Sequence, residues 1–198
     1  MDKKDVIAFF DDCAKNWDSI NLQNHNTINK ILDIAGVCEG KRVLDVACGT
    51  GVLFDEYLKR NVQSVTAIDI SKEMVKLSKE KYPAINVICA DAETFDFNGE
   101  YDCIVIYNAF PHFVNPEKLF ENLFCFLADK GRLTVAHGAS REDIIKCHSG
   151  NASIVSNELI EAEKLAEIMM SFVSVDTVIS DDEKYIVSGV KNKSKSEK

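Results

Sequence analysis

Apolar residues recur along the chain with two different spacings. Helical spacing over residues 6–17 and again over 28–35 predicts two helices at the start of the chain, the second of them ended by Gly36. From Arg42 onward, short apolar runs alternate with helical segments. These runs predict five strands, at residues 43–47, 64–68, 85–89, 101–107 and 131–137. Strands that alternate with helices in this way predict a parallel sheet covered by helices on both faces.

The connecting segments carry their own helix signals. Ser71 is suited to cap a helix after the second strand, and Pro116 to open a helix after the fourth. The last third departs from the alternation. Expected there are a short helix, a loop, a longer helix and two strands joined by a turn, at residues 140–147, 150–153, 157–168, 172–179 and 184–190. The strand pair predicts a terminal antiparallel hairpin added to the parallel sheet.

Composition and charge restrict the class of protein. Of 198 residues, 46% are hydrophobic and 28% charged, with only 9 Gly and 3 Pro, so collagen-like and disordered classes are excluded. The net charge of -9 disfavours binding to a phosphate backbone, so no nucleic-acid partner is expected. We expect a single domain over residues 1–190 and a disordered basic tail over residues 191–198.

The number and setting of the cysteines, together with the hydropathy of the chain, indicate the cellular compartment of the protein. The seven cysteines are odd in number, form no C-x-x-C pair and mostly stand in apolar runs, which predicts reduced thiols in the core. The chain starts with charged residues and has no apolar run long enough to cross a membrane. The sequence therefore predicts a cytoplasmic protein without an export signal or membrane span.

A turn of small residues follows the first expected strand. Residues 45–51 read DVACGTG, and small residues at a strand-to-helix turn let the backbone approach a ligand closely. The NAD fingerprint needs a third glycine where Phe54 stands, and the lysine of a phosphate-binding loop is missing as well. A turn with no ligand would also favour these glycines. The pattern favours a nucleotide-type ligand other than NAD.

Acidic residues stand at the ends of the first three strands: Asp45, Asp69 and Asp91. Asp69 lies twenty residues after Gly49, where a carboxylate in a doubly wound sheet can accept hydrogen bonds from both ribose hydroxyls. Its alternative role as a helix cap is already filled by Ser71. Asp91 reaches the same edge and could accept a hydrogen bond from an exocyclic amine.

These residues resemble the class I S-adenosylmethionine-dependent methyltransferases, and the resemblance runs from about Phe9 to Val190. Residues 43–51 resemble the family's first motif, with Ala47 where glycine is commoner, a change we expect to be mild. The resemblance implies a doubly wound α/β fold whose seven strands lie in the order 3-2-1-4-5-7-6, with strand 7 antiparallel. It also implies an N-terminal helical lid over residues 1–40.

The resemblance implies roles for individual residues in binding S-adenosylmethionine. Asp45, Gly49 and Gly51 would line its methionine part, Asp69 would hold the ribose, Ile70 would pack on the adenine, and Asp91 with Ala92 would meet the adenine amino group. The remaining cofactor-binding candidates in the two motifs are Ala47, Cys48 and Asn108.

The acceptor side is less specific in sequence. Residues 107–113 resemble the family's fourth-strand motif, but they lack the N-P-P-aromatic tetrad of its protein- and nucleic-acid-amine methylating branch, which favours a small-molecule acceptor. His112 and His137 follow neighbouring strands in the implied order, so both should project into one crevice as candidate catalytic bases. Scaffold histidines, bound only by structural hydrogen bonds, are the alternative.

Four further residues are candidates for acceptor binding. Phe10 and Trp17 belong to the expected lid, and Arg141 and His148 share one face of the expected helix after the fifth strand, although a solvated face is an equal alternative. No spacing typical of metal ligands is present, so no metal is expected. Two other functions stay open: an S-adenosylmethionine-binding protein without catalysis, and a protein methyltransferase.

Overall fold

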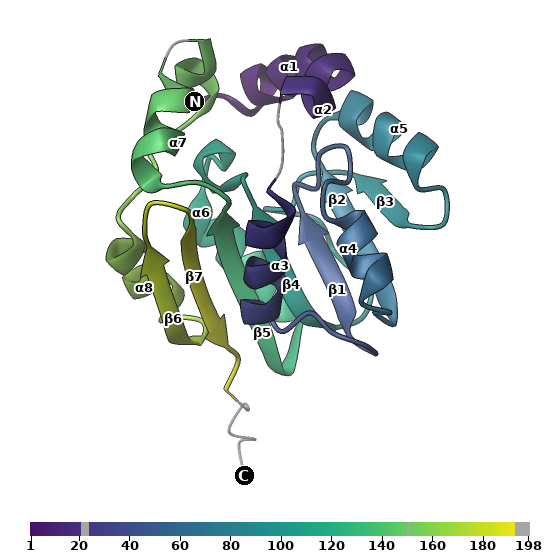
Figure 1. The fold of residues 1–198 in the computed structure, drawn as a ribbon, viewed down its shortest axis with the longest axis vertical. Helices are drawn as coiled ribbons and strands as arrows, with labels where there is room; N and C mark the ends of the chain where they lie inside the picture. The colour runs from purple at the N-terminus through teal and green to yellow at the C-terminus, as the bar shows by residue number, and fades with distance from the viewer. Residues whose placement is uncertain (21–23, 150, 193–198) are drawn as a thin grey trace.

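The computed structural model describes residues 1–20, 24–149 and 151–192, and its centre is one seven-stranded sheet (Figure 1). The strand order is β3-β2-β1-β4-β5-β7-β6, so the predicted order is confirmed. The strands are β1 Arg42–Val46, β2 Ser64–Asp69, β3 Asn86–Cys89, β4 Tyr101–Tyr107, β5 Leu127–His137, β6 Ser174–Ser180 and β7 Tyr185–Val190. The first five pair in parallel, and β7 runs antiparallel to both of its neighbours.

Helices cover both faces of this sheet. They are α1 Lys3–Cys13, α2 Trp17–Ile20, α3 His25–Ile34, α4 Phe54–Lys59, α5 Lys72–Lys81, α6 Pro116–Phe126, α7 Arg141–His148 and α8 Ala162–Met169, with short 3-10 turns η1 Ala14–Asn16, η2 Phe110–His112 and η3 Asn151–Val155. Because side chains alternate along a strand, β1 sends Val43 into the core under α3 and α4, and Leu44 into the core under α6 and α8. Figure 1 shows α3 and α4 in front of the sheet.

Local signals in the sequence fix several element ends. Ser71 caps α5 by accepting a hydrogen bond from the Met74 amide, and Pro116 occupies the first turn of α6 behind the Asn115 cap. Among the described residues, no helix is long and apolar enough to cross a membrane.

The segment after α7 differs from the prediction. The expected helix from Asn157 begins only at Ala162, because residues 157–161 are used in tertiary contacts. The Asn157 amide donates to the Pro111 carbonyl, and the Leu159 carbonyl accepts from Arg141. Within the expected loop over 150–153, the described part belongs to η3.

The cysteine prediction was wrong in part. All seven thiols are free, but only Cys48 and Cys103 are buried. Four are exposed: Cys38, Cys89, Cys125 and Cys147. Because successive side chains of a strand or helix point in different directions, some residues of an apolar run lie at the surface. The run by itself does not show which residues these are. The predicted tail lies outside the described residues from position 193 on.

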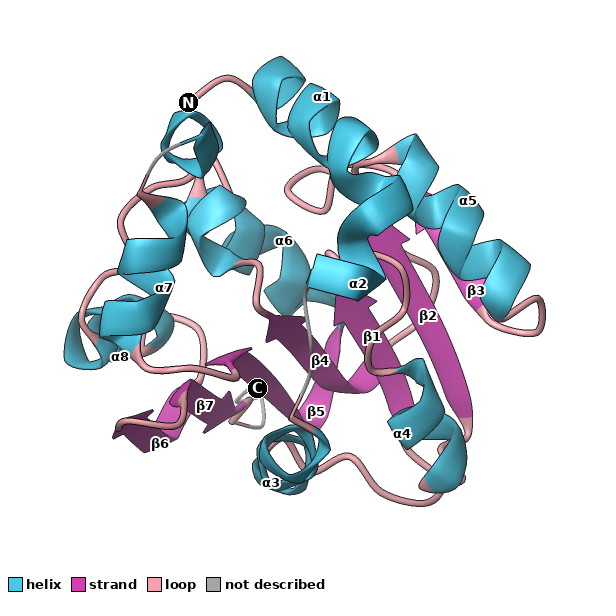
Figure 2. Cartoon of the chain, turned by 45° about the horizontal axis from the view of Figure 1, so that its top comes forward, coloured by secondary structure: helices cyan, strands magenta, loops and turns pink. Residues whose placement is uncertain are grey.

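The N-terminal segment lies across the ends of the strands. Figure 2 shows α1 and α2 above the strand ends, with α1 running beside α5. Asp11 of α1 accepts a hydrogen bond from the Ser71 hydroxyl at 2.6 Å and from the Glu73 amide at 3.2 Å. The carboxylate of Asp18 pairs with Lys81 at 2.8 Å and accepts from the Thr50 hydroxyl. These contacts place α1 and α2, called the lid below, over the carboxyl edge of the sheet. The prediction of a lid over residues 1–40 also included α3, which packs on the face of the sheet instead.

Candidate active site

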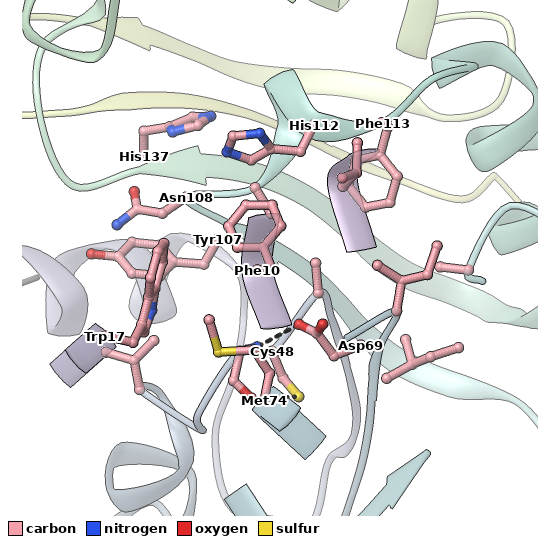
Figure 3. A pocket seen from close by; sticks show the side chains of 18 of the residues that line it. Phe10, Trp17, Cys48, Asp69, Met74, Tyr107, Asn108, His112, Phe113 and His137 are labelled. Atoms are coloured by element: carbon pink, nitrogen blue, oxygen red, sulfur yellow. Dashed lines mark hydrogen bonds between the residues drawn. The ribbon is translucent and has the colours of Figure 1, made fainter. Parts of the chain in front are cut away.

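A cavity of about 420 Å³ lies between the lid and the carboxyl ends of β1, β2, β4 and β5. Its wall includes most of the residues singled out in the sequence. Those present are Phe10, Trp17, Ala47, Cys48, Gly49, Asp69, Ile70, Asp91, Ala92, Asn108, His112, His137 and His148. Figure 3 shows Asp69 and Cys48 on one side of the cavity, and His112 and His137 on the other. We call the Asp69 side of the cavity the cofactor half and the histidine side the acceptor half, after the roles that the motifs predict for these residues.

The turn after β1 has the backbone conformation that its small residues suggest. Gly49 has φ +54°, and a Cβ there would meet the Trp17 indole nitrogen at 3.6 Å. Ala47 also has a positive φ, 57°, a conformation that costs a non-glycine residue about 1–2 kcal/mol. The replacement of glycine at this position is therefore less mild than expected.

Two predicted cofactor residues do not line the cavity. A Cβ at Gly51 would lie 2.6 Å from the Phe54 ring, so this glycine serves the packing of the turn. Asp45 is buried with 1% exposure on the face of β1 that packs against α4, because it shares that face with Val43. Burial raises the pKa of Asp45 to about 8. Neither residue therefore lies at the cavity wall, where the predicted contact to the methionine part would require it.

Asp69 has the environment of a ribose-binding carboxylate. Its Oδ2 accepts a hydrogen bond from the Gly49 amide at 2.8 Å, and its Oδ1 accepts from the Ser71 amide at 2.9 Å. These bonds fix the carboxylate at the cavity wall, where it can also accept hydrogen bonds from ligand hydroxyls. Burial raises the pKa of Asp69 to about 6, although hydrogen bonds from the backbone amides of Ser71, Gly49 and Ile70 oppose that shift.

Asp91 carries a partner that the sequence did not reveal. The Lys3 ammonium pairs with Asp91 and, at 2.6 Å, with Glu93, whose side chain is 3% exposed. The Asn115 amide donates to the other oxygen of Glu93 at 3.0 Å. Glu93 comes directly after Asp91 and Ala92, so its position beside these motif residues is a signal in the sequence for a place near the site. Lys3 gave no local signal, since its contact spans 88 residues.

This ion pair fastens the start of α1 to the end of β3. We expect Lys3→Met to weaken the docking of α1, because a partly buried charged hydrogen-bond pair contributes on the order of 1 kcal/mol or more. Amide hydrogen exchange over residues 3–13 should become about fivefold faster or more. Lys4→Met, on the same helix but exposed, is the matched control and should leave exchange unchanged. Equal exchange in both variants would show that Lys3 does not hold the lid.

The lid reaches the acceptor half through aromatic side chains. Phe10 packs edge-on against Trp17 at 5.5 Å and against the His112 ring at 4.8 Å between centroids. Figure 3 shows Phe10 between the cofactor side and the histidine side of the cavity. Phe10 therefore forms part of the same cavity wall as His112.

His112 is held in one tautomer. Its Nδ1 lies 2.8 Å from the Val155 carbonyl, which can only accept, so Nδ1 carries the hydrogen and Nε2 keeps the lone pair. The Ser156 hydroxyl approaches the same nitrogen at 3.1 Å. Burial lowers the pKa of His112 to about 4. Val155 and Ser156 had no sequence signal, because they reach His112 from more than forty residues away.

His137 and His148 complete a group of imidazoles with His112. The rings of His112 and His148 lie 4.9 Å apart, and burial lowers the pKa of His148. His137 is 2% exposed, and its Nε2 has no hydrogen-bond partner among the described residues. Burial, with the two neighbouring histidines, lowers the pKa of His137 to about 3. All three rings are neutral at physiological pH.

Arg141 does not line the cavity. Its Nε donates to the Leu159 carbonyl at 2.8 Å, and its other nitrogens pair with Glu158 and Glu161. The i, i+7 spacing places Arg141 and His148 on one helical face, but a long side chain can turn toward acids that follow later in the chain. The guanidinium therefore braces α7 against residues 158–161.

Comparison of the sequence with known proteins finds a family and individual relatives. A family model described as "Methyltransferase domain" matches residues 43–131. The chain belongs to the S-adenosylmethionine-dependent methyltransferases. It is 31% identical to demethylmenaquinone methyltransferase of Renibacterium salmoninarum over 69% of this chain and 60% of that one. It is equally identical to malonyl-[acyl-carrier protein] O-methyltransferase 1 of Ilyobacter polytropus, over 67% and 52%. The chain thus spans just over half the length of these methyltransferases.

Solved structures share the methyltransferase fold at low identity. The DhpI complex with SAH superposes with a TM-score of 0.74 and 15% identity, covering 96% of this chain and 97% of that one. The N-methyltransferase NodS from Bradyrhizobium japonicum WM9, in complex with S-adenosyl-l-homocysteine, has a TM-score of 0.74 and 13% identity, with 94% and 98% covered. These likenesses support the fold of this methyltransferase chain.

Proposed function

We propose that this methyltransferase transfers the methyl group of S-adenosylmethionine to a small-molecule acceptor. The observation that carries the proposal is one lidded cavity with the Asp69 carboxylate at one end and the His112 and His137 imidazoles at the other. Its wall combines the Asp69 carboxylate beside the glycine turn with apolar and aromatic groups beside the histidines, as a ligand with a polar nucleoside and a separate acceptor requires.

Residues of the cofactor half fit S-adenosylmethionine. Asp69 would hold the ribose, Ile70 and Ala92 would contact the adenine, and the backbone of the turn at Gly49 would approach the methionine part. When bound, the cofactor would supply a methyl group on a cationic sulfur. The carbon–sulfur bond breaks as an acceptor heteroatom bonds to the methyl carbon, and the sulfur keeps the electron pair of the broken bond. The protein aligns the acceptor, excludes water through the lid and receives the acceptor's proton.

His112 and His137 are proposed as the groups that position the acceptor and take this proton. Their lowered pKa values keep both rings neutral, so a lone pair is available above about pH 5. A weak base suffices here, because the acceptor heteroatom becomes strongly acidic as its new bond to carbon forms. The base does not have to deprotonate the acceptor beforehand.

The type of acceptor and the cellular compartment are proposed from the net charge and the free thiols. A net charge of -9 supports a small-molecule acceptor over a nucleic acid. Seven free thiols, four of them exposed, support a reducing compartment such as the cytoplasm.

Two measurements, made one after the other, test the proposed function. We expect calorimetric titration to show binding of S-adenosylhomocysteine, and NADH to leave that binding unchanged because the glycine pattern does not suit a dinucleotide. A panel of small-molecule acceptors should then produce S-adenosylhomocysteine. Cofactor binding with no product on any acceptor would favour the non-catalytic alternative, whereas product on protein acceptors alone would favour a protein methyltransferase.

A further inference from the structure

The acceptor half of the cavity offers no free cation among the described residues. Lys3 is the single lysine or arginine in the described lining, and its ammonium already pairs with Asp91 and Glu93. The charged group near the histidines is the Asp143 carboxylate, whose pKa is lowered by hydrogen bonds from Ser140 and Lys146. An anionic acceptor would therefore lose its hydration there without gaining a partner.

The imidazoles do not supply the missing charge. Burial keeps His112, His137 and His148 neutral, so they present lone pairs and N–H groups but no positive charge. The buried Nε2 of His137 lacks a partner among the described residues. A buried polar atom without a partner destabilises the free protein, and a ligand removes that cost by forming the hydrogen bond.

The rest of the acceptor wall is apolar. Phe10, Phe113, Val114 and Ile144 line it beside the histidines. The whole cavity, of about 420 Å³, lies near the lower end of ligand pockets and must also hold the cofactor. The room left beside the histidines therefore suits a small acceptor body.

We propose that the acceptor is a small uncharged compound with an apolar body and a hydroxyl or thiol as its reacting group, recognised by a hydrogen bond to His137 Nε2. This inference rests on the proposed methyl transfer. The reacting group donates its hydrogen to Nε2, and that hydrogen leaves as a proton while the heteroatom keeps the electron pair and bonds to the methyl carbon. No free cation balances a carboxylate, and a protonated amine has no lone pair for the transfer.

Matched probes test the charge preference on the whole protein saturated with S-adenosylhomocysteine. Benzyl alcohol, benzoate and benzylamine share one ring and differ in charge at neutral pH. We expect ligand-observed NMR titration to show benzyl alcohol binding about tenfold or more tightly than benzoate, since the carboxylate has no partner. Benzoate or benzylamine binding as tightly as benzyl alcohol, or no binding of benzyl alcohol, would overturn the inference. These results need no variant and so do not depend on a mutant's folding.

A substitution tests the role of His137. His137→Phe keeps a ring but removes Nε2, so the affinity for benzyl alcohol should fall about two- to tenfold while that for S-adenosylhomocysteine stays unchanged. His25→Phe is the matched control, since His25 lies on α3 with its side chain 67% exposed. An unchanged benzyl alcohol affinity would remove His137 from recognition. Failure of the wild-type protein to bind S-adenosylhomocysteine overturns the proposed function and the inference together, whereas bound S-adenosylhomocysteine with the wrong probe preference overturns the inference alone.

Discussion

Replacing His137 or His112 with alanine is expected to lower turnover on the true acceptor by about 10²- to 10⁴-fold while changing the affinity for S-adenosylhomocysteine by no more than about twofold. Both rings lie on the wall opposite Asp69, so their loss affects the acceptor and leaves the contacts to the ribose intact. Steady-state kinetics with the acceptor found by screening, and calorimetry with S-adenosylhomocysteine, measure the two effects separately. A smaller loss of turnover would indicate that the histidines position the acceptor without taking its proton.

The controls separate chemistry from folding. His137 is buried, so His137→Gln, which keeps most of the volume of the side chain, accompanies the alanine variant. His25→Ala changes the exposed histidine on α3 and should keep full turnover. If both active-site variants keep full turnover, or lose S-adenosylhomocysteine binding as badly as Asp69→Ala, the histidines belong to the scaffold or to the cofactor half.

Asp69→Ala is expected to weaken S-adenosylhomocysteine binding by more than about tenfold. A hydrogen bond to a charged group contributes about 1.5–3 kcal/mol, and both ribose hydroxyls would donate to this carboxylate. The variant also releases the amides of Gly49 and Ser71, which adds to the loss by loosening the turn. Calorimetric titration measures the affinity, and Asp129→Ala, an exposed aspartate on β5, is the control. Unchanged affinity in folded Asp69→Ala protein would contradict the central role of this carboxylate.

The raised pKa of Asp69 adds a pH signature to this experiment. Ribose hydroxyls stabilise the ionised carboxylate, so binding must release a proton once the pH falls below about 6, the pKa in the free protein. Affinity should therefore decline by up to about tenfold per pH unit below that value and level off above it. In Asp69→Asn, this pH dependence should disappear. Asp45 also lies near Asp69 and has a raised pKa, so a decline that persists in Asp69→Asn would point to Asp45.

Much of the fold was determined by local patterns in the sequence. The alternation of short apolar runs with helical segments gave five parallel strands, and the two runs joined by a turn gave the terminal hairpin. The acidic residues Asp69 and Asp91 were found at the cavity because the carboxyl ends of parallel strands meet at one edge. The order of the strands in the sheet could be predicted only from the family resemblance. The spacing of hydrophobic residues indicates which residues are buried but not which strands are neighbours.

Tertiary structure alone decided the contacts that span long stretches of the chain. Lys3 meets Asp91 and Glu93, and Val155 orients His112, through partners that no local spacing links. Arg141 pairs with Glu158 and Glu161 because a flexible charged side chain can reach the opposite charges that lie nearest to it in space. Side-chain direction on a strand decided the rest: Asp45 points under α4, and the cavity is left with neutral imidazoles and without a free cation among the described residues.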